Sequence, residues 1–384
     1  MKAWVLRGIN DIGREEVPVP APGAHEVLVR VKAAGICGSD IPRIYETGAH
    51  RHPLIPGHEF SGVVEELGDD VPETWSGKAV GIFPLIPCRK CQPCQKRQYE
   101  MCRNYNYLGS RTDGGFAEYV TVPVDNLVPL PEGVSYEEAA MMEPMAVAVH
   151  AMRRIFPEAN AHAGSTFEET VSPNENGGVT VAVCGLGTIG LLLIMFLKQL
   201  GIKNILAIGN KDNQRNTLQQ LGLKEDHYCD SREGNVPAWL SEHTDGKGPD
   251  VFFECVGKKE TVSLAVDSIA PAGRICLVGN PHSDMALDRD VYWKILRHQL
   301  TLTGTWNSSF HIEKNGDASA ESADTRETAD RDDWDYVLER LAKREIQPKA
   351  LISHRFSLET LEQGFEIMRD KSEDYIKIMV QMED

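Results

Sequence analysis

Residues 179–201 read VTVAVCGLGTIGLLLIMFLKQLG. An apolar run of strand length leads into a turn with three glycines, and a longer apolar stretch of helical character follows. In such a unit the first glycine permits the tight turn, the second lets the backbone approach a pyrophosphate, and the third allows close helix–strand packing. The N–H groups at the start of the helix bind the phosphates. The segment therefore predicts a dinucleotide site formed by Gly185, Leu186, Gly187, Thr188, Ile189 and Gly190.

The residues that follow repeat this alternation of strand and helix. Strand-like runs occur as NILAIG, DVFFECVG, GRICLVGN and LTLTGTW, and VYWKILRHQ has helical character. Strands separated by helices of this length predict βαβ units around a doubly wound parallel sheet. Before residue 140 the pattern differs, because short β-type runs such as EVLVRVKAAG and FSGVVEELG are interrupted by proline and glycine turns. We therefore predict an α/β fold in which a β-rich domain precedes the parallel-sheet domain.

Two polar insertions interrupt these patterns, at about residues 157–178 and 313–333. The second reads EKNGDASAESADTRETADRDD and contains no large apolar side chain. Such segments cannot bury enough apolar surface to pack, so we predict that both are solvated surface loops. From residue 334 the sequence WDYVLERLAKREIQPKALISHRFSLETLEQGFEIM resumes helical and strand patterns.

The composition excludes several classes of function. The chain has 384 residues, 41% of them hydrophobic, and its 40 Lys and Arg against 57 Asp and Glu give a formal net charge of −17. This is an ordinary globular composition, and the acidic excess with no basic run argues against nucleic-acid binding. The N-terminus MKAWVLRGINDIGREE lacks the apolar core of a signal peptide, and no stretch has the roughly 18 apolar residues that span a membrane. We therefore expect a cytoplasmic protein without membrane association.

The end of the second strand bears on which dinucleotide is bound. An NAD-binding strand commonly ends in Asp or Glu, which binds the ribose hydroxyls, but NILAIG ends at Gly209 and continues with Asn210 and Lys211. A missing carboxylate removes the charge that would repel a 2′-phosphate, and Lys211 or Arg215 would attract it. We favour NADP over NAD, with contacts from Gly209, Asn210 and Lys211. The alternative is that Asp212 binds the ribose and Lys211 is an ordinary solvated charge.

Four of the nine cysteines lie in one pattern, C-x2-C-x2-C-x7-C, formed by Cys88, Cys91, Cys94 and Cys102. Disulfides are rare in the cytosol, so cysteines clustered on a short, proline-interrupted loop indicate a metal site. Four soft thiolates leave no position for water, which is typical of a closed, tetrahedral, structural zinc site.

A second set of metal-binding residue types is dispersed along the chain. It consists of Cys37 in GICGSD, His58 and Glu59 in PGHEFSG, and Glu143 in MMEPMAV. Each residue alone is unremarkable. Together one thiolate, one imidazole and carboxylates form a mixed set that commonly leaves one zinc position open for water or substrate. The spacing alone does not establish this site.

The motifs GICGSD, GHEFSG, the four-cysteine loop, DGGFAEYVTVP, MEPMAVAVHA and GLGTIG, in that order, resemble the zinc-dependent medium-chain dehydrogenases over nearly the whole chain. The resemblance implies a GroES-like, β-rich catalytic domain of residues 1–150 and 308–384, and a Rossmann domain of residues 151–307. It also implies homodimers or homotetramers. Within the family, CGSDIPRIYETGAH, LGSRTDGGFAEY and KILRHQLTLTGTW resemble the galactitol-1-phosphate 5-dehydrogenases, which are relatives of the sorbitol and threonine dehydrogenases.

The resemblance also implies residue roles at a catalytic zinc. It makes Cys37, His58 and Glu143 zinc ligands, with Glu59 either a fourth ligand or a group that exchanges with water. Ser39 matches the family hydroxyl that takes the proton of the alcohol, although a turn hydroxyl that caps the next helix is the alternative. Many relatives have a relay His three residues beyond that serine. This sequence has Pro42 there, so we expect proton release by another path, through ordered water or Glu59.

Further cofactor and substrate contacts are expected at strand ends and in the matching motifs. Ligands lie at the carboxyl ends of parallel strands, which points to the loops Cys255, Val256, Gly257 and Val278, Gly279, Asn280. For a substrate phosphate the nearby basic residues are Arg43, His50, Arg51, His52 and Arg111. We favour Arg43 and Arg111, because they lie in the segments that carry the resemblance.

Together these features predict a zinc-dependent oxidoreductase with two zinc ions per chain and NADP or NAD. It would interconvert a secondary alcohol of a polyol, above all a sugar-alcohol phosphate, with the ketose. A dehydrogenase of free polyols or of another small secondary alcohol is the first alternative. The second is a non-catalytic dinucleotide- or zinc-binding protein, because fold does not imply function.

Overall fold

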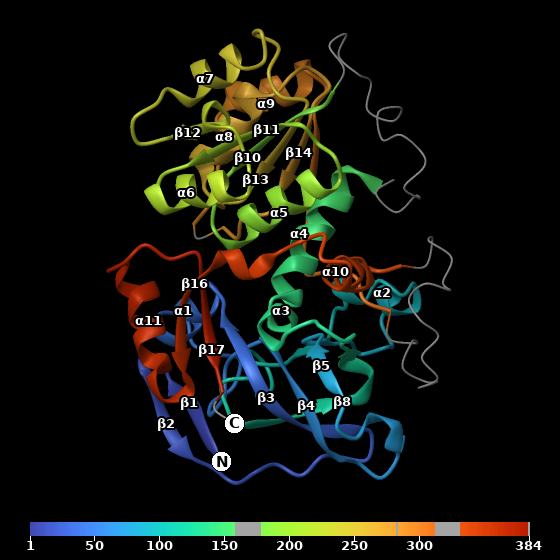
Figure 1. Cartoon of the computed structure of the whole chain (residues 1–384). Coiled ribbons are helices and arrows are strands. Elements are labelled where there is room, and N and C mark those ends of the chain that lie inside the picture. Colours follow the sequence, from blue (N-terminus) through green and yellow to red (C-terminus); the bar gives the residue numbers. More distant parts are fainter. Residues whose placement is uncertain (158–177, 282, 312–330, 383–384) are drawn as a thin grey trace. The chain divides into compact units, whose positions relative to one another are not determined.

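The computed structural model describes residues 1–157, 178–281, 283–311 and 331–382 (Figure 1). Most of the two polar insertions therefore lies outside the described residues. The end of the second insertion is described, and it differs from the solvated loop we predicted. Asp332 caps helix α10 (Asp333–Ala342) through a bond to the amide of Asp335, and the side chain of Asp333 accepts bonds from the amide and hydroxyl of Ser309. Both aspartates are buried because the helix start and residue 309 use their carboxylate oxygens.

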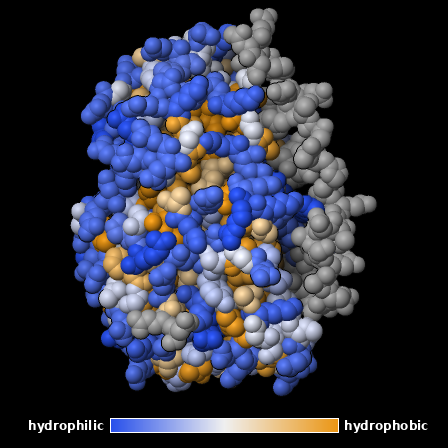
Figure 2. All heavy atoms as spheres, viewed as in Figure 1, coloured by the Kyte–Doolittle hydropathy of each residue, from blue (hydrophilic) through white to orange (hydrophobic). Residues whose placement is uncertain are grey.

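The chain divides into two compact units. The first contains Met1–Ala146 together with C-terminal segments that begin at Ser308 and at Asp332, and the second contains Val147–Asn307. The boundary falls within helix α4 (Met142–Ile155). None of the described helices is long and apolar enough to cross a membrane. On the face drawn in Figure 2 most surface side chains are hydrophilic, as the charged composition requires.

The second unit is built around a six-stranded sheet in the order β12-β11-β10-β13-β14-β15, and every neighbouring pair is parallel. The order reverses at β10, and in such sheets ligands bind at the carboxyl ends of the strands at this switch point. The predicted doubly wound parallel sheet is confirmed. Its strands are β10 (Thr180–Cys184), β11 (Asn204–Gly209), β12 (Tyr228–Asp230), β13 (Val251–Glu254), β14 (Arg274–Leu277) and β15 (Thr301–Gly304).

Helices pack on both faces of this sheet, because alternate strand residues point to opposite sides. On one face Ala182 and Phe252 belong to a core cluster that includes residues of α7, α8 and α9. On the other, Phe253 packs against Phe156, and the thiol of Cys276 lies against the carbonyl of Ala151 in α4. Burial on both faces explains why the strands read as continuous apolar runs. The remaining helices are α5 (Thr188–Gln199), α6 (Asp212–Gln220), α7 (Val236–Glu242), α8 (Lys259–Ser268) and α9 (Arg289–Arg297).

The first unit is rich in antiparallel strands. Its main sheet runs β16-β17-β3-β4-β5-β9, with β8 also paired to β3. Two further antiparallel pairs join β1 to β2 and β6 to β7. The main strands are β3 (Glu26–Ile36), β4 (Glu59–Leu67), β5 (Ala79–Ile82), β8 (Tyr119–Pro123), β9 (Leu127–Pro129), β16 (Ile352–Ser357) and β17 (Lys377–Gln381). The shorter pairs are β1 (Lys2–Gly8), β2 (Asp11–Glu16), β6 (Leu85–Ile86) and β7 (Asn106–Tyr107).

The C-terminal segment is part of this β-rich unit. Strand β17 pairs antiparallel with β3, with Ile378 opposite Ile36. Phe365 of helix α11 (Leu361–Asp370) contacts Trp4 and Phe116 edge-to-face at ring centroid distances of 6.1 and 5.6 Å. The unit's shorter helices are α1 (Asp40–Tyr45), α2 (Gln92–Gln95) and α3 (Tyr136–Ala140).

Candidate active site, metal centres and cofactor site

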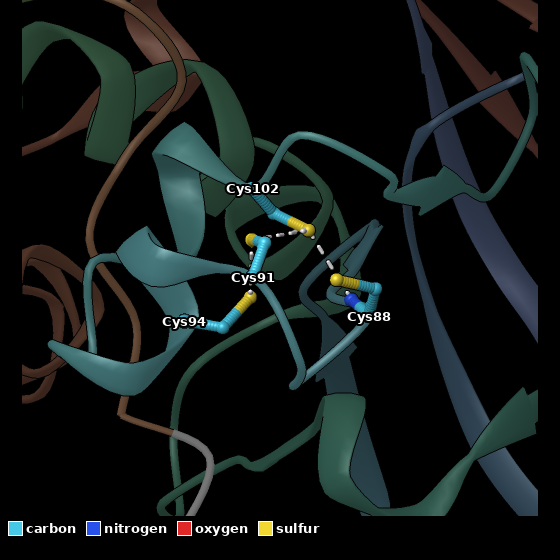
Figure 3. Close-up of side chains that lie close together, drawn as sticks. All are labelled: Cys88, Cys91, Cys94 and Cys102. Atoms are coloured by element: carbon cyan, nitrogen blue, oxygen red, sulfur yellow. Dashed lines mark hydrogen bonds between the residues drawn. The ribbon is translucent and has the colours of Figure 1, made fainter.

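The four clustered cysteines point toward one another (Figure 3). Their sulfur atoms all lie within 4.8 Å of one another, and the sulfur of Cys91 is 3.4 Å from that of Cys94 and 3.9 Å from that of Cys102. Cys91 precedes the short helix α2 and Cys94 lies in it, with Pro93 between them at its first turn. This turn brings residues three apart onto one side of the helix. The loop therefore presents four thiols to one point, as the spacing predicted.

The four thiols are unequal in the absence of a cation. Hydrogen bonds from the backbone amides of Arg103 and Cys94 lower the pKa of Cys91 to about 6. Burial raises the pKa of Cys94 to about 12. One thiolate thus forms readily at neutral pH, whereas the buried one needs a bound cation to ionise. A divalent ion with a preference for sulfur supplies that charge, so the donor set fits zinc.

A second group of ligand atoms is formed by Cys37, His58 and Glu59, which lie within 4.8 Å of one another. Cys37 follows directly after β3, and His58 directly precedes β4. Antiparallel pairing sets Gly35 opposite Glu59, so the end of one strand meets the beginning of the other. His58 and Glu59 are buried and Cys37 is partly exposed. The sheet register thus assembles residues about twenty positions apart.

Asp40 contacts both Cys37 and His58 and so helps to orient them. Its fully buried carboxylate accepts a bond from the amide of Cys37 at 3.0 Å, and Arg43 pairs with its other side. His58 Nδ1 lies 3.5 Å from Asp40 Oδ1, too long for a well-formed hydrogen bond but close enough for an ion pair. Burial alone would lower the pKa of His58, but Asp40 and Cys37 raise it well above its usual value. With Nδ1 facing Asp40, the opposite ring nitrogen remains for a metal.

Glu59 has a buried counter-ion. Lys377 of β17 donates one hydrogen bond to Glu59 and another, of 3.0 Å, to the carbonyl of Ile36. Both charged side chains are 2% exposed. A Cβ on Gly35 would overlap the Glu59 carboxylate and the end of Lys377, so only glycine leaves room for this pair. Glu59 is therefore fixed between Lys377 of the C-terminal strand and the other two ligand residues, Cys37 and His58.

Glu143 lies at the start of α4 and is held by a tyrosine. The hydroxyl of Tyr107 donates a hydrogen bond of 3.0 Å to its carboxylate, and the Tyr107 ring meets the His58 ring edge-on at 5.8 Å. Burial raises the pKa of Glu143 to about 7, and Glu59 adds to the rise, while His58 opposes it. Glu143 does not belong to the group of ligand atoms within 4.8 Å of one another. It lies close enough to His58 and Glu59 for their charges to act on its carboxylate, and it is bonded to Tyr107.

The remaining predicted residues of this unit are also placed. Ser39 occupies the capping position of α1 but makes no capping bond; instead its hydroxyl lies 3.3 Å from the sulfur of Cys37. Arg43 is paired with Asp40, and Arg51 with Asp113 at 2.7 Å. The Arg111 guanidinium lies 4.3 Å from the centroid of the Tyr105 ring and donates to the Tyr105 carbonyl at 3.3 Å.

Two of these basic residues and one histidine share an electrostatic environment. Burial lowers the pKa of His50, and the charges of Arg111 and Arg43 lower it further. By contrast, His52 is turned toward the backbone, with Nδ1 3.3 Å from the carbonyl of Leu6 and Nε2 accepting from the amide of Ala49. Arg43, Arg111 and His50 therefore lie close enough to interact, whereas His52 is bonded elsewhere.

The glycine-rich turn of the second unit has the shape that a pyrophosphate requires. Gly185 has φ +96°, and a Cβ there would meet Val256 at 2.6 Å. At Gly187 nothing lies within 4 Å of an added Cβ, so its backbone is open to a ligand, and it caps α5. The loops Cys255–Gly257 and Val278–Asn280 touch, because a Cβ on Gly279 would overlap Val256 and Gly257. The predicted loops therefore meet at the carboxyl ends of β10, β13 and β14.

Comparison with known proteins agrees with this geometry. The alcohol dehydrogenase GroES-like domain matches residues 23–132 and the zinc-binding dehydrogenase matches residues 188–322. Galactitol 1-phosphate 5-dehydrogenase of Escherichia coli (strain K12) is 34% identical over 339 residues, 88% of this chain and 88% of that protein. This chain belongs to the zinc-containing medium-chain dehydrogenases. Its membership, its GroES-like and Rossmann-type fold and its nature as an enzyme of the alcohol and polyol dehydrogenase family are thereby confirmed.

Other relatives extend the similarity to the whole chain. Sorbitol dehydrogenase of Arabidopsis thaliana is 29% identical and covers 99% of this chain and 94% of its own. The crystal structure of galactitol-1-phosphate dehydrogenase from Escherichia coli superposes with a TM-score of 0.81 at 31% identity, covering 99% of this chain and 100% of that chain. The chain therefore shares the fold of galactitol-1-phosphate dehydrogenase.

Both donor sets fit zinc. The four-cysteine cluster is a structural zinc site, because it is closed and offers only thiolates. Cys37, His58 and Glu59 form the catalytic zinc site, whose mixed donors leave a position for substrate. The open glycine turn binds NAD(P).

Three functional contacts escaped sequence reasoning. Asp40 is the last residue of GICGSD, but nothing in the sequence indicated a role for it. Tyr107 immediately precedes the segment LGSRTDGGFAEY and was not singled out. Lys377 is 318 residues from Glu59, and no local pattern joins them. The sequence offered one hint of a buried ion pair, which was the positive charge of Lys377 within the mostly apolar segment YIKIMVQ.

Proposed function

We propose that this dehydrogenase oxidises a secondary alcohol of a sugar-alcohol phosphate to the ketose, reversibly, with NADP(H) or NAD(H). The observation that carries the proposal is the buried group Cys37, His58 and Glu59, oriented by Asp40, in a chain that also has an open dinucleotide turn. A buried carboxylate that aims an imidazole is an arrangement that metal sites use to set ligand orientation.

The chain's own residues prepare the site for this chemistry. A zinc ion held by Cys37, His58 and Glu59 would lower the pKa of the substrate alcohol from about 16 towards about 7, and a nicotinamide bound at the glycine turn would accept the hydride. Ser39 would accept the alcohol proton and pass its own hydroxyl proton onward; its position, with the hydroxyl 3.3 Å from the sulfur of Cys37, supports this role. Because Pro42 provides no side chain to relay it, the proton leaves through water or Glu59. Glu59, paired with Lys377, is thus either a resting ligand or the group that exchanges with water.

A phosphorylated substrate is supported by the basic residues near the motifs. Arg43 already neutralises Asp40, so Arg111 is the better phosphate ligand of the two favoured residues. Its guanidinium is stacked on Tyr105, which fixes its plane while leaving further N–H donors for an anion. The similarity to galactitol 1-phosphate 5-dehydrogenase points in the same direction.

Initial rates of nicotinamide reduction test the substrate class. Galactitol 1-phosphate, galactitol, sorbitol and xylitol are each compared with NAD and with NADP. Activity confined to the phosphorylated polyol supports the proposal. Activity on free polyols alone supports the alternative of a sorbitol-dehydrogenase-like enzyme, which the Arabidopsis relative favours. A protein that holds one zinc per chain and is inactive throughout would be the non-catalytic alternative.

Substitution of Arg111 by Ala tests the phosphate contact. KM for the phosphorylated polyol should rise by about tenfold or more, because a charge-assisted bond is lost, while kcat changes little. Arg369→Ala is a matched control, since Arg369 is likewise stacked on a tyrosine, Tyr45, at 4.9 Å but lies in α11. Equal effects on phosphorylated and free polyols would refute the role.

A homodimer or homotetramer is part of the same proposal. Helix α9 exposes Tyr292, Trp293 and Leu296, and Trp306 is also 55% exposed just after the edge strand β15. Large apolar side chains gathered beside a free sheet edge are typical of association surfaces. Light scattering after size exclusion gives the mass, and Trp293→Ser combined with Leu296→Ser should lower it to that of one chain.

A further inference from the structure

Two arginines, Arg215 and Arg232, lie near Tyr228 beside the carboxyl end of β11. Arg215, in α6, lies 5.3 Å from the Tyr228 ring centroid, and the Tyr228 hydroxyl donates a bond of 3.3 Å to the carbonyl of Lys211. Arg232 follows two residues after β12 and donates to Asp212 at 2.8 Å. A third basic residue, Lys211, occupies the capping position just before α6. No local pattern in the sequence pointed to Arg232, because the strand before it, β12, is only three residues long and was not among the apolar runs.

The structure brings Arg232 beside the end of β11. The amide of Ser231 donates a bond of 2.8 Å to the carbonyl of Gly209, the last residue of β11. In a doubly wound sheet the adenosine ribose of a dinucleotide binds at this strand end. Gly209 also touches the glycine turn, since an added Cβ would lie 2.8 Å from the side chain of Leu186. Arg232 therefore borders the ribose position, next to the turn that holds the pyrophosphate.

A side chain with the usual ribose-binding carboxylate would collide with its neighbours at position 209. A Cβ on Gly209 would also lie 2.6 Å from Oε1 of Gln214, and that oxygen is fixed by a bond of 2.9 Å from the amide of Asn210. Gln214 is buried, so it cannot swing aside cheaply. A neutral amide thus occupies the space of the carboxylate. Consequently Gly209→Asp is a poor probe of cofactor preference, because it would have to displace the side chains of Gln214 and Leu186 whatever the enzyme binds.

The Arg232 guanidinium is oriented by bonds to two carboxylates and keeps N–H donors for a further anion. Its Nε and Nη2 form a fork with the carboxylate of Asp230, at 3.0 and 2.6 Å, and Nη2 also reaches Asp212. The N–H groups of Nη1 are left for another acceptor. Asp230 is 12% exposed and anchors the fork, whereas Asp212 is 83% exposed and can turn into solvent. Lys211, Arg215 and Arg232 exceed these two carboxylates by one positive charge.

We propose that Arg232 is the residue that binds the adenosine 2′-phosphate of NADP(H) and so sets the cofactor preference. Lys211 and Arg215 supply the remaining charge, and Asp212 acts as a removable counter-ion that competes with the phosphate for Arg232. This inference deepens the proposed function and rests on its dinucleotide site. It replaces Asp212 as a ribose ligand, because Asp212 lies in the first turn of α6 and is engaged by Arg232.

Binding of NADP⁺ and NAD⁺ to the full-length enzyme, measured by isothermal titration calorimetry, tests the assignment. The readout is the ratio of the two Kd values, which does not depend on zinc chemistry or on a substrate. Arg232→Gln should weaken NADP⁺ about tenfold and leave NAD⁺ nearly unchanged, because one charge-assisted contact to the phosphate is lost. Asp212→Asn should act in the opposite direction and tighten NADP⁺. Lys203→Gln, at the exposed opposite end of β11, is the control and should leave the ratio unchanged.

The opposite sign expected for Asp212→Asn separates a specific effect from misfolding, because damage to the unit would weaken both cofactors in both variants. If Arg232→Gln keeps the wild-type ratio while Arg215→Gln abolishes it, the assignment to Arg232 is overturned and the NADP preference stands. If the wild-type enzyme binds NAD⁺ as tightly as NADP⁺, the inference and the NADP preference both fail. The polyol reaction would survive that result, because the rate assays test it with both cofactors.

Discussion

Lys377 of the C-terminal strand donates a hydrogen bond to Glu59, and each side chain of this pair is 2% exposed. The pair joins β17 to the first residue of β4, next to the catalytic donors Cys37 and His58. A charge buried so deeply persists only when its partner is present, because transfer from water to the interior costs several kcal/mol per ion. The last strand of the chain is therefore tied electrostatically to the active site.

Lys377→Met should destabilise the enzyme by about 3–5 kcal/mol, since it leaves the Glu59 carboxylate buried without its partner. Denaturant unfolding followed by circular dichroism measures the loss. The double variant Lys377→Met with Glu59→Gln should recover most of it, because no uncompensated charge remains. Losses that simply add in the double variant would show that the two side chains do not act as a pair.

Tyr107→Phe should accelerate zinc loss from the catalytic site. The substitution removes only the hydroxyl that donates to Glu143, so the carboxylate next to the ligands becomes free to move. Removal of an outer contact at a metal site typically costs about 10–100-fold in metal affinity. Zinc release to a chelator, followed with a colorimetric indicator, gives the rate. Tyr105→Phe is the control, because that ring stacks with Arg111 and its hydroxyl has no described bond to Glu143. Equal rates in both variants would contradict the prediction.

The zinc-free enzyme should lose stability as the pH rises from about 5 to about 8. Burial raises the pKa of Glu143 to about 7 from an ordinary value of 4.5, and Asp40 and Cys37 raise the pKa of His58. A group that binds its proton more tightly when folded contributes stability below its unfolded pKa and loses it as the pH passes its folded pKa. Thermal melting at a series of pH values measures the slope.

Glu143→Gln should flatten that slope in the zinc-free enzyme, because the amide does not titrate while it can still bond to Tyr107. Zinc-loaded enzyme should show a weaker fall as well, since metal binding displaces the protons. A zinc-free Glu143→Gln variant with the full wild-type slope would assign the titration to other groups.

Cys94→Ser should reduce the zinc content from two ions per chain to one and lower Tm, because the loop from Cys88 to Cys102 loses a ligand on which its fold depends. Metal analysis by mass spectrometry and a thermal melt test both effects. Cys229→Ser is the control, since Cys229 is a buried thiol of β12 outside both metal groups. Retention of both zinc ions by Cys94→Ser would contradict the structural role.

The two metal centres differ in how far sequence could predict them. Cys91 and Cys94 are close in sequence, and one helical turn brings them together. Their spacing was therefore enough to predict the four-cysteine site. Cys37 and His58 meet only because β3 and β4 pair in one register. Without the motif resemblance, that register was not readable from the chain, and their role stayed open.

The cofactor site divides in the same manner. The pattern VTVAVCGLGTIG determined a strand, a tight turn and a helix start, because glycine positions and apolar periodicity are local properties of the backbone. The sequence also showed that the strand ends at Gly209, where an NAD-binding strand commonly has a carboxylate. Only the tertiary structure shows which side chains lie where that carboxylate would be. Gln214 fills the space beside Gly209, and Arg232 lies nearby, two residues after the neighbouring strand β12.

By itself, then, the sequence of this dehydrogenase determined the βαβ unit, the cysteine cluster and the order of the family motifs. These depend on residues near one another along the chain, where the geometry of helix, strand and turn is nearly fixed. The tertiary structure decided the partners of Glu59, Glu143 and Gly209. Such contacts depend on strand order and register, which long-range packing selects and no local pattern encodes.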